Sequence, residues 1–360
     1  MSGARGDERE RRHGGGRRGG ARGIDWRRGD PVTGDAVNGE ASTAPRPFRF
    51  GVGPSGLLGD LAPAWRATVA EIDGLGYDSL CLGDHLSMMG PLPALAAAAA
   101  WSERLALGLM VAGNDYRSPV LLAQEAMTVQ AISDGRLELG LGAGWEAADY
   151  RQLGLTFDRA GARIDRLEEA VRIVRLYCAG EPFDFAGEHY RLEGVTPAVR
   201  GPRPRLMIGG GGPRILSLAA READIVGINV PLGGADLRSS LAAGATAAER
   251  VEAAVATVRT AAGPRLAEIE LHVNVLACEV TANDDDAAAR TADVAARLGV
   301  EPGDLDDSPF VLIGTAAALP AKLRRLRERL GVSYFTVPRS AAAGLAPLLP
   351  GLIGDNAATG

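Results

Sequence analysis

Beyond residue 47, short runs of aliphatic and β-branched residues alternate with longer segments whose apolar residues recur every three or four positions. Short runs bounded by Gly, Asp, Asn or Pro are typical of buried strands, and the longer period is typical of helices. The eight runs are Phe48–Val52, Ser79–Leu82, Leu105–Val111, Arg136–Leu139, Arg205–Ile208, Ile225–Val230, Ile269–Glu279 and Tyr334–Val337. The clearest helical stripe is Ile164, Leu167, Val171, Val174 and Cys178.

Eight strand-helix alternations predict a closed (β/α)8 TIM barrel over residues 47–353. An open, doubly wound α/β sheet is the alternative, because the number of strands alone does not show closure. Two stretches, Gly180–Pro204 and Ala282–Ile313, are longer than plain connections, and we interpret them as insertions. Such insertions could be lids over a ligand, since barrel sites form from loops at strand carboxyl ends, or structural flaps without ligand contact.

The first 46 residues have a different composition, with ten arginines, eleven glycines and almost no apolar residues. Such a segment cannot offset the entropy lost on ordering, so it predicts a disordered Arg/Gly-rich tail, with a flexible C-terminus at residues 354–360. Arg11-Arg12 and Arg17-Arg18 would suit an export signal, but Gly19–Asp30 contains no apolar stretch. An Arg/Gly tail can also contact RNA; we interpret this one as a passive extension.

The overall composition favours a cytoplasmic protein that acts on small molecules. Hydrophobic residues make up 46% of the chain, and the net charge of -6 gives no general attraction for nucleic acid. No apolar run reaches the roughly 18 residues that a membrane span needs. Cys81, Cys178 and Cys278 lack CxxC spacing, which favours buried thiols in a reducing compartment over a disulfide framework or a zinc site.

The strongest candidate for catalysis is the pair Asp84-His85, directly after the second predicted strand. Barrel catalysis occurs at this edge, so His85 could hold the proton that balances a hydride or enolate step, or bond a carbonyl of a ring cofactor, while Asp84 orients a neighbour. A structural role for the pair is the alternative. No two histidines have metal-ligand spacing, and there is no GxSxG motif, so we predict no catalytic metal.

Two glycine-rich segments could approach a phosphate closely. Gly140–Gly144 follows the fourth predicted strand, and Gly209-Gly210-Gly211-Gly212 precedes a helix whose N-terminus and Arg214 add positive charge. The second segment is not a Rossmann fingerprint, because Asp224 precedes its strand instead of ending it. A P-loop is excluded, since Lys322 is the only lysine of the chain. A purely structural role for the glycines is the alternative.

The third predicted strand ends in Met110-Val111-Ala112-Gly113-Asn114, where small residues permit a bulge or an unusual peptide against a flat ring. Trp145 follows the first glycine segment and could either form the wall of a pocket or belong to the core.

Taken in order, these motifs resemble the bacterial luciferase-like superfamily, and within it the branch that uses the deazaflavin coenzyme F420. The segments that carry the resemblance are Phe50-Gly51-Val52, Gly83-Asp84-His85, Gly113-Asn114, Arg117-Ser118-Pro119, Gly135-Arg136, Gly142-Ala143-Gly144-Trp145 and Gly209–Gly212. The resemblance spans about Phe48–Leu349. It implies a barrel with insertions that holds a flavin or deazaflavin at the strand carboxyl ends, in a homodimer.

By position, Asp84 and His85 match the family's pair beside the cofactor, which contributes to proton transfer in several members. Met110–Gly113 matches a bulge in which a non-proline cis peptide supports the ring, although one residue fewer before Pro119 leaves the cis bond unassigned. Gly142–Trp145 and Gly209–Gly212 match segments that contact the cofactor's chain and phosphate.

The resemblance also implies which residues are structural and which bear on the choice of substrate. It implies that the Arg163–Glu169 helix is scaffold. Trp145 stands where certain sugar-phosphate dehydrogenases carry an acid, which argues against that activity.

The resemblance therefore implies an F420-dependent oxidoreductase that transfers a hydride between the deazaflavin and a small organic metabolite. One alternative is an FMNH2-dependent monooxygenase that uses dioxygen; a flavin or F420 reductase is the expected partner. A non-catalytic flavin-binding barrel is the second alternative. For the homodimer, the Ala-rich Leu92–Trp101 helix could pack on a second subunit, or simply on the barrel.

Overall fold

The computed structural model describes residues 45–53, 61–229 and 248–354. The predicted tail, except for its last two residues, and the predicted flexible C-terminus, except for Gly354, lie outside the described residues. So does Val230, the last residue of the sixth predicted strand. None of the helices in these described ranges is long and apolar enough to cross a membrane.

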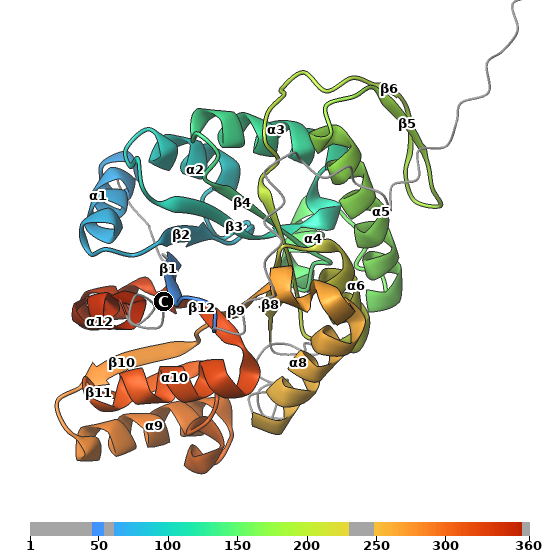
Figure 1. Cartoon of the computed structure of the whole chain (residues 1–360). Helices are drawn as coiled ribbons and strands as arrows, with labels where there is room; N and C mark the ends of the chain where they lie inside the picture. Colours follow the sequence, from blue (N-terminus) through green and yellow to red (C-terminus); the bar gives the residue numbers. More distant parts are fainter. Residues whose placement is uncertain (1–44, 54–60, 230–247, 355–360) are drawn as a thin grey trace, which may run out of the picture. The chain divides into compact units, whose positions relative to one another are not determined.

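Eight parallel strands close into a barrel, in the order β1-β12-β9-β8-β7-β4-β3-β2 (Figure 1). The strands are β1 (Arg49–Gly53), β2 (Ser79–Leu82), β3 (Ala106–Gly113), β4 (Leu137–Gly142), β7 (Arg205–Gly210), β8 (Ile225–Ile228), β9 (Glu270–Asn274) and β12 (Val332–Pro338). Closure confirms the predicted TIM barrel and excludes the open sheet.

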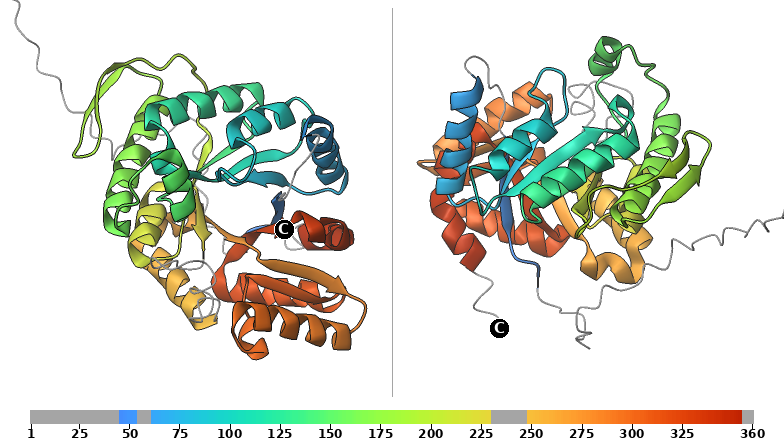
Figure 2. Two further views of the ribbon diagram at one scale, coloured as in Figure 1. Left: turned by 180° about the vertical axis from the view of Figure 1, so that it is seen from behind. Right: turned by 90° about the horizontal axis from the view of Figure 1, so that it is seen from above.

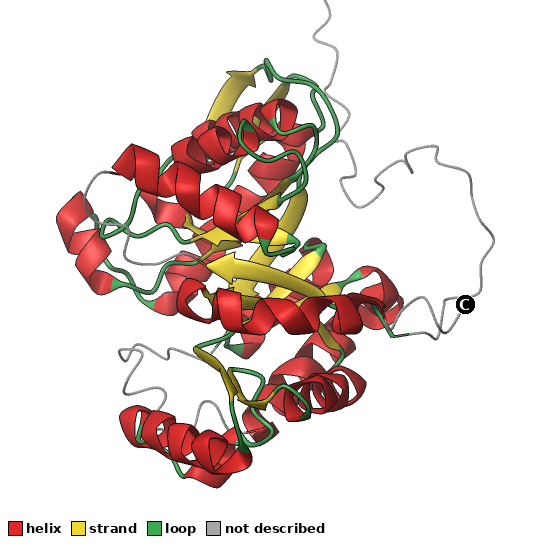
Figure 3. Cartoon of the chain, turned by 90° about the vertical axis from the view of Figure 1, so that its left-hand side faces the viewer, coloured by secondary structure: helices red, strands yellow, loops and turns green. Residues whose placement is uncertain are grey.

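Helices surround the strands, as Figures 2 and 3 show. They are α1 (Leu61–Gly74), α2 (Pro91–Ala99), α3 (Pro119–Ile132), α4 (Ala147–Leu153), α5 (Ala160–Cys178), α6 (Pro213–Glu222), α8 (Ala248–Ala262), α9 (Asp284–Leu298), α10 (Ala318–Leu330), α11 (Arg339–Leu345) and α12 (Leu349–Gly354). Short 3-10 turns are η1 (Asn114–Tyr116), η2 (Gly263–Glu268), η3 (Pro302–Leu305) and η4 (Ala346–Leu348). The predicted stripe buries Leu167, Val171 and Val174 of α5 in the core.

The first predicted insertion contains an antiparallel hairpin of β5 (Phe183–Ala186) and β6 (Arg191–Val195), beside α5 in Figure 1. The buried Glu169 of α5 accepts hydrogen bonds from the backbone amides of Glu188, His189 and Tyr190 at 2.7–3.0 Å. Although burial opposes it, these bonds hold the pKa of Glu169 below its ordinary value. Glu169 therefore fastens the hairpin tip to α5, a scaffold role.

The seventh predicted run, Ile269–Glu279, is two strands, so that prediction was wrong. Only β9 joins the barrel; β10 (Ala277–Thr281) leaves it and pairs in parallel with β11 (Val311–Thr315). The chain turns where Leu276 N donates to Phe310 O at 2.8 Å. The run contains no Gly or Pro that would mark a break, so the sequence pattern hid this change of sheet. The insertion therefore begins before Ala282.

The Ala-rich α2 packs on its own chain. Leu92, Leu95 and Ala98 are buried, and the Trp65 indole donates to Ala94 O at 3.0 Å. Packing on the barrel thus accounts for its apolar face, and the homodimer stays a prediction.

At the amino ends of the strands, four charged side chains meet inside the barrel. Arg49 contacts Glu138 at 2.9 Å and Glu270 at 2.8 Å. Arg205 contacts the same two carboxylates at 3.1 and 2.9 Å, and the Tyr334 hydroxyl donates to Glu138 at 3.1 Å. Burial alone would lower the pKa of Arg49, but Glu138, Tyr334 and Glu270 raise it above its ordinary value. We call these four charged residues the charge layer.

Two kinds of titratable group lie in or near the barrel core. The three cysteines are free, and burial raises the pKa of Cys178 to about 11 and that of Cys278 to about 12. His272 of β9 is buried, with Nε2 at 2.9 Å from Thr336 Oγ1 and its ring edge-on to Tyr334. Burial, and then the charge of Arg49, lower the pKa of His272 to about 3.

The depressed pKa of His272 predicts a stability that falls in mild acid. In the unfolded chain a histidine binds a proton near pH 6.5, whereas in the folded protein His272 binds one only near pH 3. The contribution of neutral His272 to the free energy of unfolding is therefore complete above pH 6.5 and decreases as the pH falls. Relative to the variant His272→Gln, the wild type should lose about 2 kcal/mol of unfolding free energy between pH 7 and pH 5. Urea denaturation at both pH values measures this difference; equal losses in the two proteins would contradict it.

Candidate functional site

The barrel brings the predicted site residues to one edge. Asp84 and His85 follow β2, Met110–Gly113 end β3, Gly142–Trp145 follow or end β4, and Gly209–Gly212 lie at the end of β7. These four strands are neighbours in the order β2-β3-β4-β7, and their carboxyl ends share one mouth of the barrel.

Strand β3 contains the bulge that the sequence predicts. Its pairing with β4 shifts register between Leu109 and Ala112, and the peptide bond between Met110 and Val111 is cis. The sequence located this segment but did not assign the cis bond. Ala112 and Gly113 are buried, whereas Met110 and Val111 are partly exposed.

The glycines of β4 and β7 make room for the side chain of Val111. A Cβ at Gly142 would lie 2.6 Å from Val111 Cγ2, and one at Gly140 would lie 2.8 Å from Val111 Cγ1. At Gly209 the corresponding distance to Val111 Cγ1 is 3.2 Å, and at Gly210 a Cβ would overlap the side chain of Ile215. Packing thus accounts for glycines that the sequence analysis assigned to a phosphate.

Gly212 differs from its neighbours. A Cβ there would meet nothing within 4 Å, and Gly212 is the N-cap of α6. Contact of Gly142–Trp145 and Gly209–Gly212 with a cofactor stays a prediction, and Gly212 leaves the most open space for a phosphate.

The conformation of Gly144 and a hydrogen bond from Arg163 fix the loop after β4. Gly144 has φ +77°, a left-handed conformation that favours glycine, and Ala143 O accepts a hydrogen bond from the buried Arg163 at 3.3 Å. The loop ends at Trp145, which is 40% exposed and whose ring lies edge-on to the His85 ring with centroids 5.4 Å apart. Arg163 therefore supports the loop, as the scaffold interpretation of its helix requires.

His85 is oriented by an acid that the sequence analysis missed. Its Nδ1 lies 2.7 Å from Oδ2 of Asp149, a buried residue of α4. Leu86 N and the Tyr116 hydroxyl also donate to this carboxylate, each at 3.3 Å. Because a carboxylate only accepts, the Nδ1 proton points at Asp149, which leaves Nε2 free to accept a proton.

A signal for Asp149 is present in the sequence, four residues after Trp145. The Glu146 carboxylate caps α4 by accepting from Ala148 N at 2.9 Å, so Asp149 lies in the first turn of the helix. Asp149 lies in a helix and not at a strand end, where catalytic residues of a barrel are expected, and was therefore not predicted.

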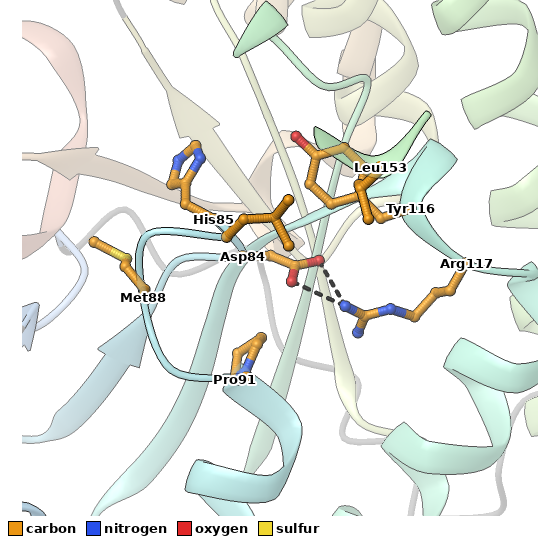
Figure 4. A pocket seen from close by; sticks show the side chains of 9 residues that line it. Asp84, His85, Met88, Pro91, Tyr116, Arg117 and Leu153 are labelled. Carbon is orange, nitrogen blue, oxygen red and sulfur yellow. Dashed lines mark hydrogen bonds and ion pairs between the residues drawn. The ribbon is translucent and has the colours of Figure 1, made fainter. Parts of the chain in front are cut away.

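Asp84 has a different role from its neighbour. Arg117 Nη2 donates to both Asp84 oxygens at 2.9 and 3.1 Å (Figure 4). Gly113 N donates to Asp84 Oδ2 at 3.1 Å. The buried carboxylate thus connects the end of β2 to the end of β3 and to Arg117. The acid that contacts His85 is Asp149, whereas Asp84 contacts Arg117 and Gly113, and its part in catalysis stays a prediction.

Asn114 is also used within the chain. Its side-chain amide donates to Asp115 Oδ1 and to the Tyr190 hydroxyl, each at 3.2 Å, and the residue is buried. It links the end of β3 to the hairpin.

A pocket of about 190 Å³ opens beside His85 (Figure 4). It is lined by Asp84, His85, Leu86, Met88, Gly90, Pro91, Tyr116, Arg117 and Leu153. A second pocket, of about 440 Å³, shares Arg117 and is lined by Asp115, Ser118, Leu155, Thr156, Asp158, Arg166 and Tyr190. Within the described ranges, no group of three or more His, Cys, Asp or Glu residues could hold a metal ion.

The model of the luciferase-like monooxygenase family matches residues 59–334. The chain belongs to this family. An F420-dependent glucose-6-phosphate dehydrogenase from Nakamurella multipartita is 34% identical over 197 residues, which cover 50% of this chain and 56% of that protein. The chain therefore matches about half the length of this relative.

Two solved structures share the fold. An F420-dependent secondary alcohol dehydrogenase in complex with an F420-acetone adduct has a TM-score of 0.68 at 16% identity, covering 85% of this chain and 99% of the other. The EDTA monooxygenase of Chelativorans sp. BNC1 has a TM-score of 0.69 at 14% identity, covering 87% and 95%. At these identities the likeness concerns the fold alone.

The contact between Gly142 and Val111 gives a test of the packing role. Gly142→Ala should lower the unfolding free energy by about 1–3 kcal/mol, because the new methyl group overlaps Val111. In a chain that carries Val111→Ala, the same substitution should have much less effect, since the overlapping methyl group is gone. Denaturant unfolding of the four proteins measures the coupling; an equal effect of Gly142→Ala in both backgrounds would refute the packing role.

Proposed function

We propose that this protein is an F420-dependent oxidoreductase that transfers a hydride between the deazaflavin and a small organic substrate. The observation that carries the proposal is the imidazole of His85, fixed on the buried Asp149 at the barrel mouth that also holds the β3 bulge. Sequence relatives that are named as F420-dependent support the choice of cofactor.

The residues at this mouth fit a flat ring with an anionic chain. Met110 and Val111 offer partly exposed apolar side chains, and the glycines beside them add no bulk. Gly212 leaves open space at the N-terminus of α6, where backbone amides favour an anion. Met110 and Val111 would support the ring, and Gly212 would bind the phosphate.

The bound deazaflavin would supply a two-electron carrier that donates or accepts a hydride. During oxidation of an alcohol, His85 Nε2 accepts the hydroxyl proton, and during reduction of a carbonyl it returns that proton. Asp149 fixes the Nδ1 proton and stabilises the imidazolium while it exists. Asp84 and Arg117 keep the ends of β2 and β3 together beside the reacting groups.

An FMNH2-dependent monooxygenase, supplied by a partner reductase, is the second candidate. The family's description and the fold shared with EDTA monooxygenase favour it. The two candidates differ first in the ligand they bind, so a binding experiment separates them from each other and from a non-catalytic barrel.

We expect oxidised F420 to bind more tightly than FMN when each quenches fluorescence in a separate titration. Preferential binding of FMN would favour the monooxygenase, and binding of neither would favour the non-catalytic barrel.

In His85→Ala, the Kd for F420 should stay within about threefold while turnover falls about 100- to 10,000-fold, because the proton acceptor is lost. His189→Ala, on the exposed hairpin, is the matched control and should keep full turnover. Unchanged turnover in His85→Ala would exclude His85 as the proton acceptor.

Replacing Asp149 by Asn tests its positioning role. The amide can no longer select the Nδ1 proton, so kcat should fall about 100-fold while KM and the Kd for F420 stay within about threefold. Asp149→Glu should restore part of kcat, and Asp293→Asn, which loses an exposed ion pair with Arg290 on α9, should change neither kcat nor KM. Steady-state kinetics gives both constants. A rise in KM with kcat unchanged would show that Asp149 serves substrate binding instead.

A further inference from the structure

The rim of the pocket beside His85 is unusually apolar for an exposed surface. Leu86, Met88 and Leu153 line the pocket with 45, 40 and 36% of their surfaces exposed, and Pro91 adds a further apolar wall. Trp145, which contacts His85, is exposed as well. Exposed apolar side chains gathered at one opening mark a surface that binds an apolar ligand.

The charges around this pocket disfavour an anion. Arg117 is the cation among its lining residues, and its Nη2 already donates to both oxygens of Asp84. Asp149, behind His85, adds a second carboxylate. Burial, and then Asp149, raise the pKa of Tyr116, so its hydroxyl stays neutral. The guanidinium of the lining is thus already paired with Asp84, and Asp149 adds negative charge behind His85, which disfavours a phosphate group in the pocket.

The neighbouring pocket does not supply a free cation either. Its second arginine, Arg166, forms ion pairs of 2.7 Å with both Asp115 and Asp158. Asp115 also accepts a hydrogen bond from the Tyr150 hydroxyl at 2.9 Å. Both arginines that line the two described pockets are thus neutralised by carboxylates.

The volume of the pocket limits the size of the ligand that it can hold. An apolar cavity of about 150 Å³ holds benzene, and the pocket beside His85 measures about 190 Å³. A ligand of one small ring or a short branched chain fits this space. One hydroxyl or carbonyl group could reach His85 while the rest of the molecule contacts Met88 and Leu153.

We propose that the substrate is a small, uncharged, apolar alcohol or carbonyl compound, and that a phosphorylated sugar is not accepted. This inference rests on the proposed function, and it separates this chain from the relatives that are named glucose-6-phosphate dehydrogenases. In the oxidative direction, bound oxidised F420 would supply the acceptor for the hydride of the carbinol carbon, and His85 Nε2 would take the hydroxyl proton, so that the alcohol becomes a ketone or aldehyde.

Binding can be tested without turnover, using 4-fluorobenzyl alcohol as the probe. Fluorine NMR of the full-length protein, with and without oxidised F420, gives its Kd. Met88→Asp and Leu153→Asp should each weaken binding at least about tenfold, because a carboxylate replaces an apolar contact. Ile132→Asp, at an exposed apolar position on α3 outside both pockets, should leave Kd within about twofold. Far-UV circular dichroism confirms that each variant is folded.

The probe experiment decides whether the pocket binds an uncharged, apolar alcohol. Loss of binding in the two pocket variants, together with no displacement by excess glucose-6-phosphate, supports the proposal. Absence of probe binding to the wild type in both conditions, equal binding by all variants, or displacement by glucose-6-phosphate would overturn it.

Turnover separates the substrate class from the proposed function. With F420, kcat/KM for benzyl alcohol should exceed that for glucose-6-phosphate at least about 100-fold, as the loss of F420 absorbance reports. A preference for glucose-6-phosphate would overturn the substrate class and leave the F420-dependent function standing. A protein that does not bind F420 would lose the proposed function, while the probe experiment would still decide what the pocket binds.

Discussion

The charge layer is the interaction on which the barrel depends. Arg49, Glu138, Arg205 and Glu270 come from four strands, and the two buried carboxylates are neutralised by two partly exposed arginines. Removing an arginine would leave buried carboxylates less well compensated, which costs stability. The four strands must therefore stay in register at this end. Two of them, β4 and β7, also carry the glycines of the site at their carboxyl ends.

The two ends of the barrel have different roles: the amino ends contribute stability, and the carboxyl ends form the candidate site. The amino ends hold ionised groups in fixed pairs, whereas the carboxyl ends combine small residues with the partly exposed Val111 and His85. Space is the limiting quantity at the carboxyl ends, since the β3 bulge pushes Val111 against Gly140 and Gly142. Asp84 then fastens the bulged strand to β2. The positions of the site residues thus follow from packing before any ligand binds.

The sequence predicted the barrel, the β3 bulge and His85 because each leaves a local pattern: alternating runs, small residues at a strand end, and an imidazole after a strand. It could not predict the partner of His85, because Asp149 lies 64 residues away and meets it only when α4 folds over β2. It could not separate the two roles of the glycines, since a glycine that accommodates Val111 has the same sequence pattern as one that approaches a phosphate. The break between β9 and β10 was hidden for a related reason: burial is visible in a sequence, but the covering partner is not.

The His85–Asp149 pair beside the pocket joins two parts of the fold that tolerate substitution to different degrees. His85 follows a barrel strand, while Asp149 belongs to a helix of seven residues that lies outside the barrel. Substitutions at Asp149 and Leu153 can therefore alter the acid or the apolar rim without replacing a strand residue. The buried Tyr150 between them bonds Asp115 and Ala143 O and has to stay. For laboratory evolution, Asp149 and Leu153 are natural positions to randomise, because they offer access to new reactivity while the closed sheet continues to provide the stability.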